Sequence, residues 1–129
     1  MDRAVLVVED DPSTLSGYVE YLTGAGFDAT GFADPAHALA TAFETPPAAV
    51  ITDITMPGMD GFALAKALHQ DQRTRHVPVI GLTANWYAEV KVRAAAVAMR
   101  TVLLKPCSPA HLVAELERVL LPLATRDRT

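Results

Sequence analysis

The chain has 129 residues, a formal net charge of -4 at pH 7 and 50% hydrophobic residues. This length fits one domain with a real core. The acidic balance argues against nucleic acid as a direct partner, because phosphate binding needs a basic surface. The single cysteine, Cys107, cannot form an internal disulfide, and no apolar run is long enough to cross a bilayer. These features predict a soluble cytoplasmic protein without membrane contact.

The first half of the chain predicts alternating strands and helices. Short apolar runs predict strands over residues 4–8, 27–32 and 48–52, of which the second is weaker and nearer an edge. An Asp-Pro pair opens each of the two helices between them, since Asp caps a helix and proline fits its first turn. These helices are predicted from Pro12 to about Ala25 and from Pro35 to just before Pro46.

The second half continues the alternation. Helices are predicted around the apolar periodicity of residues 62–68, over Trp86 to about Met99, and after the cap at Ser108. Strands are predicted over residues 77–82, with Pro78 at the strand start, and over 101–104. Five strands alternating with five helices predict an α/β, doubly wound domain whose parallel sheet is covered on both faces.

Polar residues follow four of the predicted strands. Glu9 and Asp10 follow the first, Asp53 the third, Thr83 the fourth and Lys105 the fifth. Ligands of open parallel sheets bind at the carboxyl ends of the strands, so these side chains are expected to converge. Three close carboxylates repel one another, and Mg²⁺ would relieve that repulsion while leaving positions for phosphate oxygens. An ammonium and a hydroxyl beside one carboxylate suit a phosphoryl acceptor.

These residues, in this order, resemble the receiver domains of two-component response regulators of the chemotaxis-regulator type. The resemblance runs from about Arg3 to Leu121. It implies a flavodoxin-like fold with a five-stranded parallel sheet in the order 2-1-3-4-5. Residues 1–123 would form the receiver domain, and residues 124–129 a short polar tail.

The resemblance also implies residue roles. Asp53 stands where the phosphoacceptor stands, Thr83 matches the switch hydroxyl, and Lys105 matches the phosphate-sensing lysine. The implied metal ligands for Mg²⁺ are Asp10 directly, Glu9 through water, Asp53, and the backbone carbonyl of Thr55. Lys105 and Pro106 would be joined by a cis peptide bond, and Asp11 would serve only as a helix cap.

The implied function is that of a phosphoacceptor in a phosphorelay. A sensor histidine kinase or histidine phosphotransfer protein would donate the phosphoryl group, and a downstream protein or attached output domain would respond. The chain would not be a turnover enzyme for external substrates. The chain would be either a single-domain regulator or a piece of a longer protein, such as a hybrid kinase or a multidomain regulator.

Three departures from the family pattern affect the switching step. Val102 stands where an aromatic residue is common, so a rotating ring cannot report phosphorylation. Cys107 stands where Phe often follows Lys-Pro, and is expected to be a packed small hydrophobe. Asn85 and Thr55 lie where side chains influence hydrolysis of the acyl phosphate. The face near Trp86, Tyr87, the fifth strand and the last helix is the expected output surface, with an ordinary half-buried role as the alternative for the two aromatics.

Three other functions fit the sequence less well. A haloacid-dehalogenase-like phosphatase would need a second carboxylate where Thr55 stands. A flavodoxin-like cofactor binder would need a less acidic, glycine-containing loop than residues 9–13. A degenerate receiver that only binds proteins would lack acceptor residues that are present here, and the missing aromatic residue leaves this alternative open for the switching step alone. The four histidines show no metal-ligand spacing and are expected at the surface or at caps: His37, His69, His76 and His111.

Overall fold

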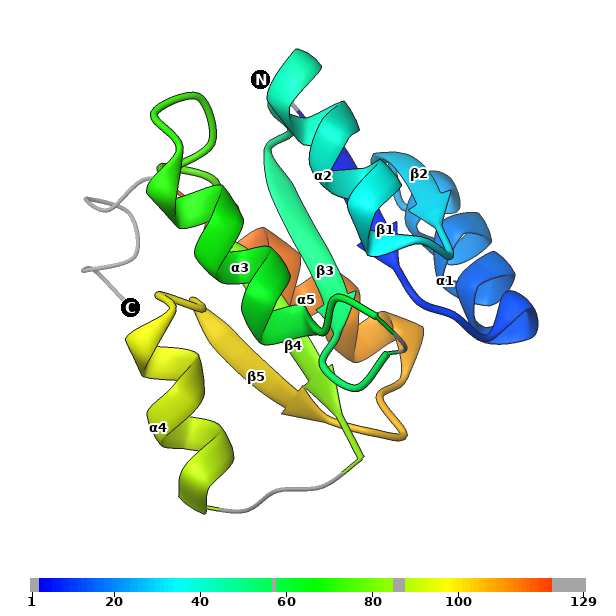
Figure 1. Ribbon diagram of the computed structural model, residues 1–129. Helices are drawn as coiled ribbons and strands as arrows, with labels where there is room; N and C mark the ends of the chain where they lie inside the picture. The colour runs from blue at the N-terminus through cyan, green and yellow to red at the C-terminus, as the bar shows by residue number, and fades with distance from the viewer. Residues whose placement is uncertain (1–2, 57, 85–87, 122–129) are drawn as a thin grey trace.

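The computed structural model describes residues 3–56, 58–84 and 88–121, in which strands and helices alternate (Figure 1). The strands are β1 (Ala4–Val8), β2 (Asp28–Phe32), β3 (Ala49–Asp53), β4 (Val79–Thr83) and β5 (Thr101–Leu104). The helices are α1 (Pro12–Gly24), α2 (Pro35–Glu44), α3 (Gly61–Gln70), α4 (Ala88–Ala96) and α5 (Pro109–Leu120). No helix among the described residues is long and apolar enough to cross a membrane.

All five strands are parallel and lie in the order β2-β1-β3-β4-β5, which confirms the predicted topology. The register pairs Val8 of β1 with Thr52 of β3, and Asp53 of β3 with Leu82 of β4. The carboxyl ends of these central strands therefore lie at one edge of the sheet. The chain reverses its strand order between β1 and β3, and this is where a parallel sheet of this kind places its ligand site.

Helices cover both faces of the sheet, as the continuous apolar strands predicted (Figure 1). In β1, Leu6 and Val8 face the cluster formed with α2, α3 and α4, whereas Val5 and Val7 face the cluster formed with α1 and α5. Every one of these four side chains is buried. The side chains of β1 are therefore taken up by the two cores, and its polar neighbours, Glu9 and Asp10, lie beyond its carboxyl end.

Side-chain caps begin the helices at the predicted positions. The Asp11 carboxylate accepts a hydrogen bond from the Thr14 N–H at 2.9 Å, and the Ser108 hydroxyl accepts one from the His111 N–H at 3.1 Å. Asp60, which was not predicted as a cap, begins α3 in the same way, through the Ala63 N–H at 2.9 Å. Each cap satisfies a donor that the helix itself leaves unpaired.

Helix α4 ends earlier than the sequence predicted. Ala98 has a φ of 60°, and its N–H donates to the Ala95 carbonyl at 3.1 Å, while the Met99 N–H donates to the Ala94 carbonyl at 2.9 Å. This pair of hydrogen bonds is the Schellman motif, which closes a helix at a left-handed residue. The prediction that the helix continues to about Met99 was therefore wrong. Its predicted start at Trp86, and the tail 124–129, fall outside the described residues.

Two strands reach one residue further than predicted at their carboxyl ends. Asp53 is the last residue of β3 and Thr83 the last residue of β4, because both still pair with the neighbouring strand. These two polar residues are thus held in the sheet itself, whereas Glu9, Asp10 and Lys105 follow their strands as predicted. A side chain on a paired strand is positioned more rigidly than one on a loop.

Candidate functional site

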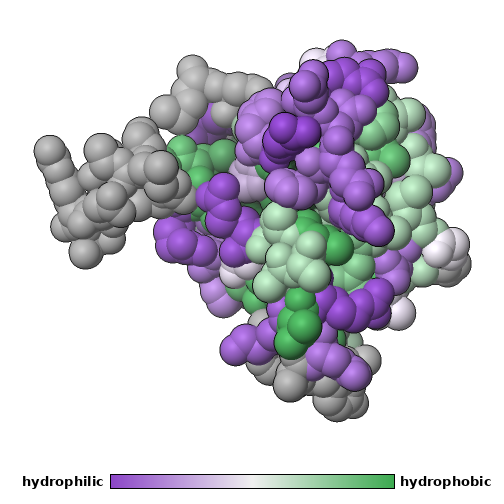
Figure 2. Space-filling model, turned by 60° about the vertical axis from the view of Figure 1, so that its left-hand side comes forward, coloured by the Kyte–Doolittle hydropathy of each residue, from purple (hydrophilic) through white to green (hydrophobic). Residues whose placement is uncertain are grey.

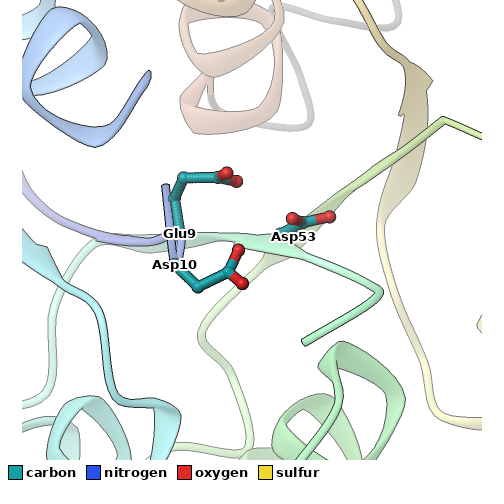
Figure 3. A group of neighbouring side chains, drawn as sticks. All are labelled: Glu9, Asp10 and Asp53. Carbon is teal, nitrogen blue, oxygen red and sulfur yellow. The ribbon is translucent and has the colours of Figure 1, made fainter. Parts of the chain in front are cut away.

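Three carboxylates converge at the carboxyl edge of the sheet (Figure 3). Glu9 and Asp10 follow β1, and Asp53 ends β3. One ligand oxygen from each of the three residues lies within 4.8 Å of the others. Glu9 and Asp53 are buried, with 2% and 7% of their surface exposed, whereas Asp10 is exposed. The register of β1 and β3 therefore creates the acidic cluster that the sequence predicted.

Lys105 reaches this cluster from the end of β5. Its ammonium nitrogen lies 3.2 Å from Asp53 Oδ2 and 3.1 Å from Glu9 Oε2. The backbone N–H of Lys105 donates to the Thr83 carbonyl at 2.7 Å, which connects the lysine backbone to the end of β4. The peptide bond from Lys105 to Pro106 is cis, as the resemblance implied. The ammonium thus bridges two carboxylates rather than pairing with one.

Burial and the neighbouring groups both shift the pKa values of Glu9 and Lys105. Burial raises the pKa of Glu9, and the nearby Asp53 charge adds to that rise, against the lowering effect of the hydrogen bond from Lys105. Burial alone would lower the pKa of Lys105, but its hydrogen bonds to Glu9 and Asp53 outweigh burial and raise that pKa. The ammonium is therefore held in its charged form beside the carboxylates.

The backbone of Asp53 is packed tightly against the start of α3. The Gly61 N–H donates to the Ile54 carbonyl at 2.9 Å. A Cβ added at Gly61 would lie 2.6 Å from the Asp53 carbonyl oxygen and 2.8 Å from the Ile54 Cα. Only glycine permits this approach, so the residue after the Asp60 cap fixes the loop that follows Asp53.

A hollow of about 290 Å³ lies next to the ends of β3 and β4. Thr83 lines it at the end of β4 and Thr55 lines it from the loop after β3; Thr83 is buried and Thr55 is exposed. Its remaining walls come from the loop after β3, α3 and α4: Ile54, Met56, Asp60, Phe62, Val90 and Arg93. Thr83, which carries the expected switch hydroxyl, therefore lines a space large enough for a small ligand group.

No residue pattern in the sequence predicted the charged pair that lines this hollow. Arg93 Nη2 of α4 lies 3.8 Å from Asp60 Oδ2, and the guanidinium carbon lies 4.2 Å from the centre of the Phe62 ring. These contacts depend on how α3 and α4 are placed relative to each other, which residue spacing within each helix does not reveal.

The expected output surface is only partly described. Leu104 of β5 is 54% exposed and Val92 of α4 is 69% exposed. Figure 2 shows this side of the molecule, where apolar surface is bordered by hydrophilic groups. Val102 packs against the cluster beneath α4. Asn85, Trp86 and Tyr87 lie outside the described residues.

The remaining candidate residues take structural positions. Cys107 is buried in the core on the α1 and α5 side, and burial raises the pKa of its thiol, as expected for a packed small residue. The Tyr18 hydroxyl donates to the Cys107 carbonyl at 3.1 Å. The four histidines are exposed.

Comparison with known proteins agrees with this geometry. The response regulator receiver domain family matches residues 5–117. The chain is 33% identical over 114 residues to the DNA-binding response regulator MtrA of Mycolicibacterium smegmatis, covering 88% of this chain and 49% of MtrA. It is 36% identical over 84 residues to the response regulator PleD of Caulobacter vibrioides, covering 65% of this chain and 18% of PleD. The chain thus spans half or less of these curated relatives.

Solved structures show the same fold. The chemotaxis protein CheY4 of Vibrio cholerae is 32% identical, with a TM-score of 0.88 over 93% of this chain and 100% of that one. The receiver domain of the sensor histidine kinase PA1611 from Pseudomonas aeruginosa is 28% identical, with a TM-score of 0.83 over 93% and 98% of the two chains. That structure carries a magnesium ion in its active site cleft. With this fold, this strand order and a family match over most of its length, the chain belongs to the response regulator receiver domains of two-component signalling.

Proposed function

We propose that Asp53 is the phosphoacceptor, and that it takes its phosphoryl group from a phosphohistidine on a partner kinase or phosphotransfer protein. The observation that carries this proposal is the placement of Asp53 between the Lys105 ammonium, at 3.2 Å, and two further carboxylates within 4.8 Å. A carboxylate beside a cation and an acidic metal cluster has the surroundings that phosphoryl transfer requires.

The donor set fits Mg²⁺. Three carboxylates face one described ammonium, so the cluster keeps an excess of negative charge when all groups are ionised. Oxygen-only ligands with few protein carboxylates are what Mg²⁺ prefers. Asp10, Asp53 and the Thr55 carbonyl would hold the ion directly, with Glu9 acting through water. The ion would neutralise charge on the phosphoryl oxygens.

Asp53, Lys105 and Thr83 have separate roles in the transfer. One Asp53 oxygen attacks phosphorus, the bond from phosphorus to the histidine nitrogen breaks, and that nitrogen keeps the electron pair. The Lys105 ammonium contacts a phosphoryl oxygen, which draws it from Glu9. The Thr83 hydroxyl donates to another phosphoryl oxygen from the hollow beside the site. The product is an acyl phosphate on Asp53.

The consequence of phosphorylation is a change of interaction surface rather than turnover of an external substrate. Thr83 and Lys105 belong to β4 and β5, so movement toward the phosphoryl group shifts the strands beside α4. Val102 offers no ring to rotate, so the change would be transmitted by the backbone and by α4. Residues 1–123 would form this receiver, with 124–129 as a tail, and a downstream protein or attached domain would respond.

The test of the acceptor is Asp53→Asn with Asp11→Asn as the matched control. Incubation with Mg²⁺ and a small phosphodonor should add one phosphoryl group to the wild type, measured by intact mass. Asp53→Asn should take none, while Asp11→Asn should be labelled normally, because Asn caps a helix as well as Asp does. Undiminished labelling of Asp53→Asn would refute the assignment.

The test of the metal site is a Mg²⁺ titration followed by thermal unfolding. Wild-type stability should rise with Mg²⁺ at concentrations on the order of millimolar, as expected for a sparse carboxylate site. Asp10→Ala should respond far less. An equal response from both proteins would count against Asp10 as a ligand.

A further inference from the structure

The hollow that Thr83 lines is also lined by a cation that the proposed transfer does not use. Two charged side chains line this hollow, Asp60 from the start of α3 and Arg93 from α4. Thr55 and Thr83 line it as well; Thr55 lies two residues after Asp53, and Thr83 ends β4, the strand that pairs with β3. A group that a phosphoryl donor at Asp53 placed in this hollow would therefore share the space with a guanidinium.

Two contacts orient the Arg93 side chain. Its guanidinium carbon lies over the Phe62 ring, 4.2 Å from the ring centre, which is a favourable cation–π distance. Asp60 Oδ2 lies 3.8 Å from Arg93 Nη2, which is a long contact. The other Asp60 oxygen accepts the cap hydrogen bond from the Ala63 N–H. A guanidinium carries five N–H donors, so this contact leaves most of its donors to meet a ligand.

We propose that Arg93 is a specificity residue for small acyl phosphates, and that it stabilises the carboxylate which such a donor releases. This inference rests on the proposed role of Asp53 as acceptor. A guanidinium matches the planar geometry of a carboxylate, which is the leaving group of an acyl phosphate. A phosphohistidine or a phosphoramidate releases a neutral nitrogen group instead, to which Arg93 offers no comparable benefit.

The chemical step distinguishes the two kinds of donor. With acetyl phosphate, an Asp53 oxygen bonds to phosphorus, the bond from phosphorus to the acyl oxygen breaks, and acetate leaves with the electron pair. With phosphoramidate, the bond from phosphorus to a protonated nitrogen breaks and ammonia leaves. Negative charge therefore develops on the leaving group only in the first reaction. Interactions that strengthen as this charge develops raise the rate of transfer and not only the affinity.

The experiment compares the two donors in matched variants, with Mg²⁺ present. Arg93→Met keeps much of the apolar length but removes the charge, and Arg93→Lys keeps the charge. The control is Arg73→Met, since Arg73 also lies over a phenylalanine ring, Phe43 at 4.5 Å, and also pairs with an aspartate, Asp71 at 2.9 Å. That control pair lies outside the hollow and the carboxylate cluster.

At low ionic strength, Arg93→Met should lower the maximal rate of labelling by acetyl phosphate about threefold to fivefold, the size of effect expected for one exposed charge. Its labelling by phosphoramidate should equal that of the wild type. Arg93→Lys should recover most of the acetyl phosphate rate, and the deficit of Arg93→Met should shrink in high salt. Arg73→Met should match the wild type with both donors.

A second variant tests the pairing with Asp60. Asp60→Asn keeps the helix cap, because Asn is an equally good cap, but releases Arg93 from its counter-charge. It should label at least as fast as the wild type with acetyl phosphate. A slower rate would overturn the proposal.

Three other results separate the possible failures. Equal slowing of both donors in Arg93→Met would show a structural role and overturn the specificity claim. Unchanged labelling by acetyl phosphate would overturn it as well. No labelling of the wild type by either donor would instead refute the phosphoacceptor function, and the inference about Arg93 would fall with it.

Discussion

Gly61→Ala is expected to damage both stability and phosphoryl transfer, because the added methyl group collides with the backbone of the acceptor residue. The new Cβ would lie 2.6 Å from the Asp53 carbonyl oxygen and 2.8 Å from the Ile54 Cα. Real contacts of this kind are longer, so the start of α3 must move away from β3 by a few tenths of an ångström. Forced overpacking of a buried site costs about 1–3 kcal/mol of unfolding free energy.

The same movement should disturb the acceptor. The Gly61 N–H bonds to the Ile54 carbonyl, directly after Asp53, so displacement of α3 changes the loop that carries the proposed Thr55 ligand. Misplacement of reacting groups by 1 Å can cost about a hundredfold in rate, and a smaller shift should lower the labelling rate of Asp53 about threefold to tenfold.

Urea unfolding and labelling by acetyl phosphate measure the two effects in one set of proteins. The control is Gly17→Ala, since Gly17 lies inside α1 and a Cβ there would meet nothing within 4 Å. That variant should be more stable by up to about 1 kcal/mol, because alanine favours the helix, and should label normally. A Gly61→Ala protein as stable and as rapidly labelled as the wild type would refute the reasoning.

Three further predictions concern single contacts. Ala98→Gly should raise the unfolding free energy by about 0.5–1 kcal/mol, because glycine adopts the observed φ of 60° without steric cost; equal or lower stability in urea would contradict this. Tyr18→Phe should lower it by about 1 kcal/mol, since the Cys107 carbonyl loses the hydroxyl that donates to it at 3.1 Å, and an unchanged urea midpoint would argue against that hydrogen bond. Arg73 lowers the pKa of Asp71 from 3.8 to about 2, so Asp71 contributes stability above pH 3.8 that is lost as the pH falls through about 2. The stability difference between wild type and Asp71→Asn should therefore shrink over that range, and a constant difference in acid titrations would disprove the pairing.

The sheet and the convergence of its polar residues could be predicted because both follow from the order of apolar and polar residues along the chain. Continuous Val, Ile and Leu runs require burial on both faces, and alternating helices supply it. Parallel strands then bring their carboxyl ends to one edge, so Glu9, Asp53 and Lys105 meet although they are far apart in sequence. No detail of side-chain packing was needed for that step.

The end of α4 could not be predicted because the chain lacks the usual stop signal. Glycine commonly marks the left-handed residue that closes a helix, but here the residue is Ala98. Alanine at that position looks like helix continuation. The tertiary structure imposes the turn instead, since the next residue, Met99, is buried beneath the sheet and its Sδ would lie 2.9 Å from a Cβ at Gly81.

The charged pair that lines the hollow was also not predicted. Arg93 contacts Asp60 and Phe62 across two helices, and neither residue is spaced from Arg93 in a pattern that a sequence would reveal. The bridge from Lys105 to Glu9 was missed for a related reason. Sequence reasoning assigned each charged residue one task, whereas the geometry lets one ammonium contact two carboxylates.

That shared ammonium bears on how a receiver without an aromatic switch can respond. Lys105 is bound at its side chain to Glu9 and Asp53, and at its backbone to the Thr83 carbonyl at 2.7 Å. In the proposed reaction, new negative charge at Asp53 competes with Glu9 for the ammonium, and Thr83 is drawn toward the same oxygens. Both responses pull on the ends of β4 and β5, which adjoin in the sheet. The strand ends themselves can then carry the signal to α4, and Val102 has only to keep its packing while they move.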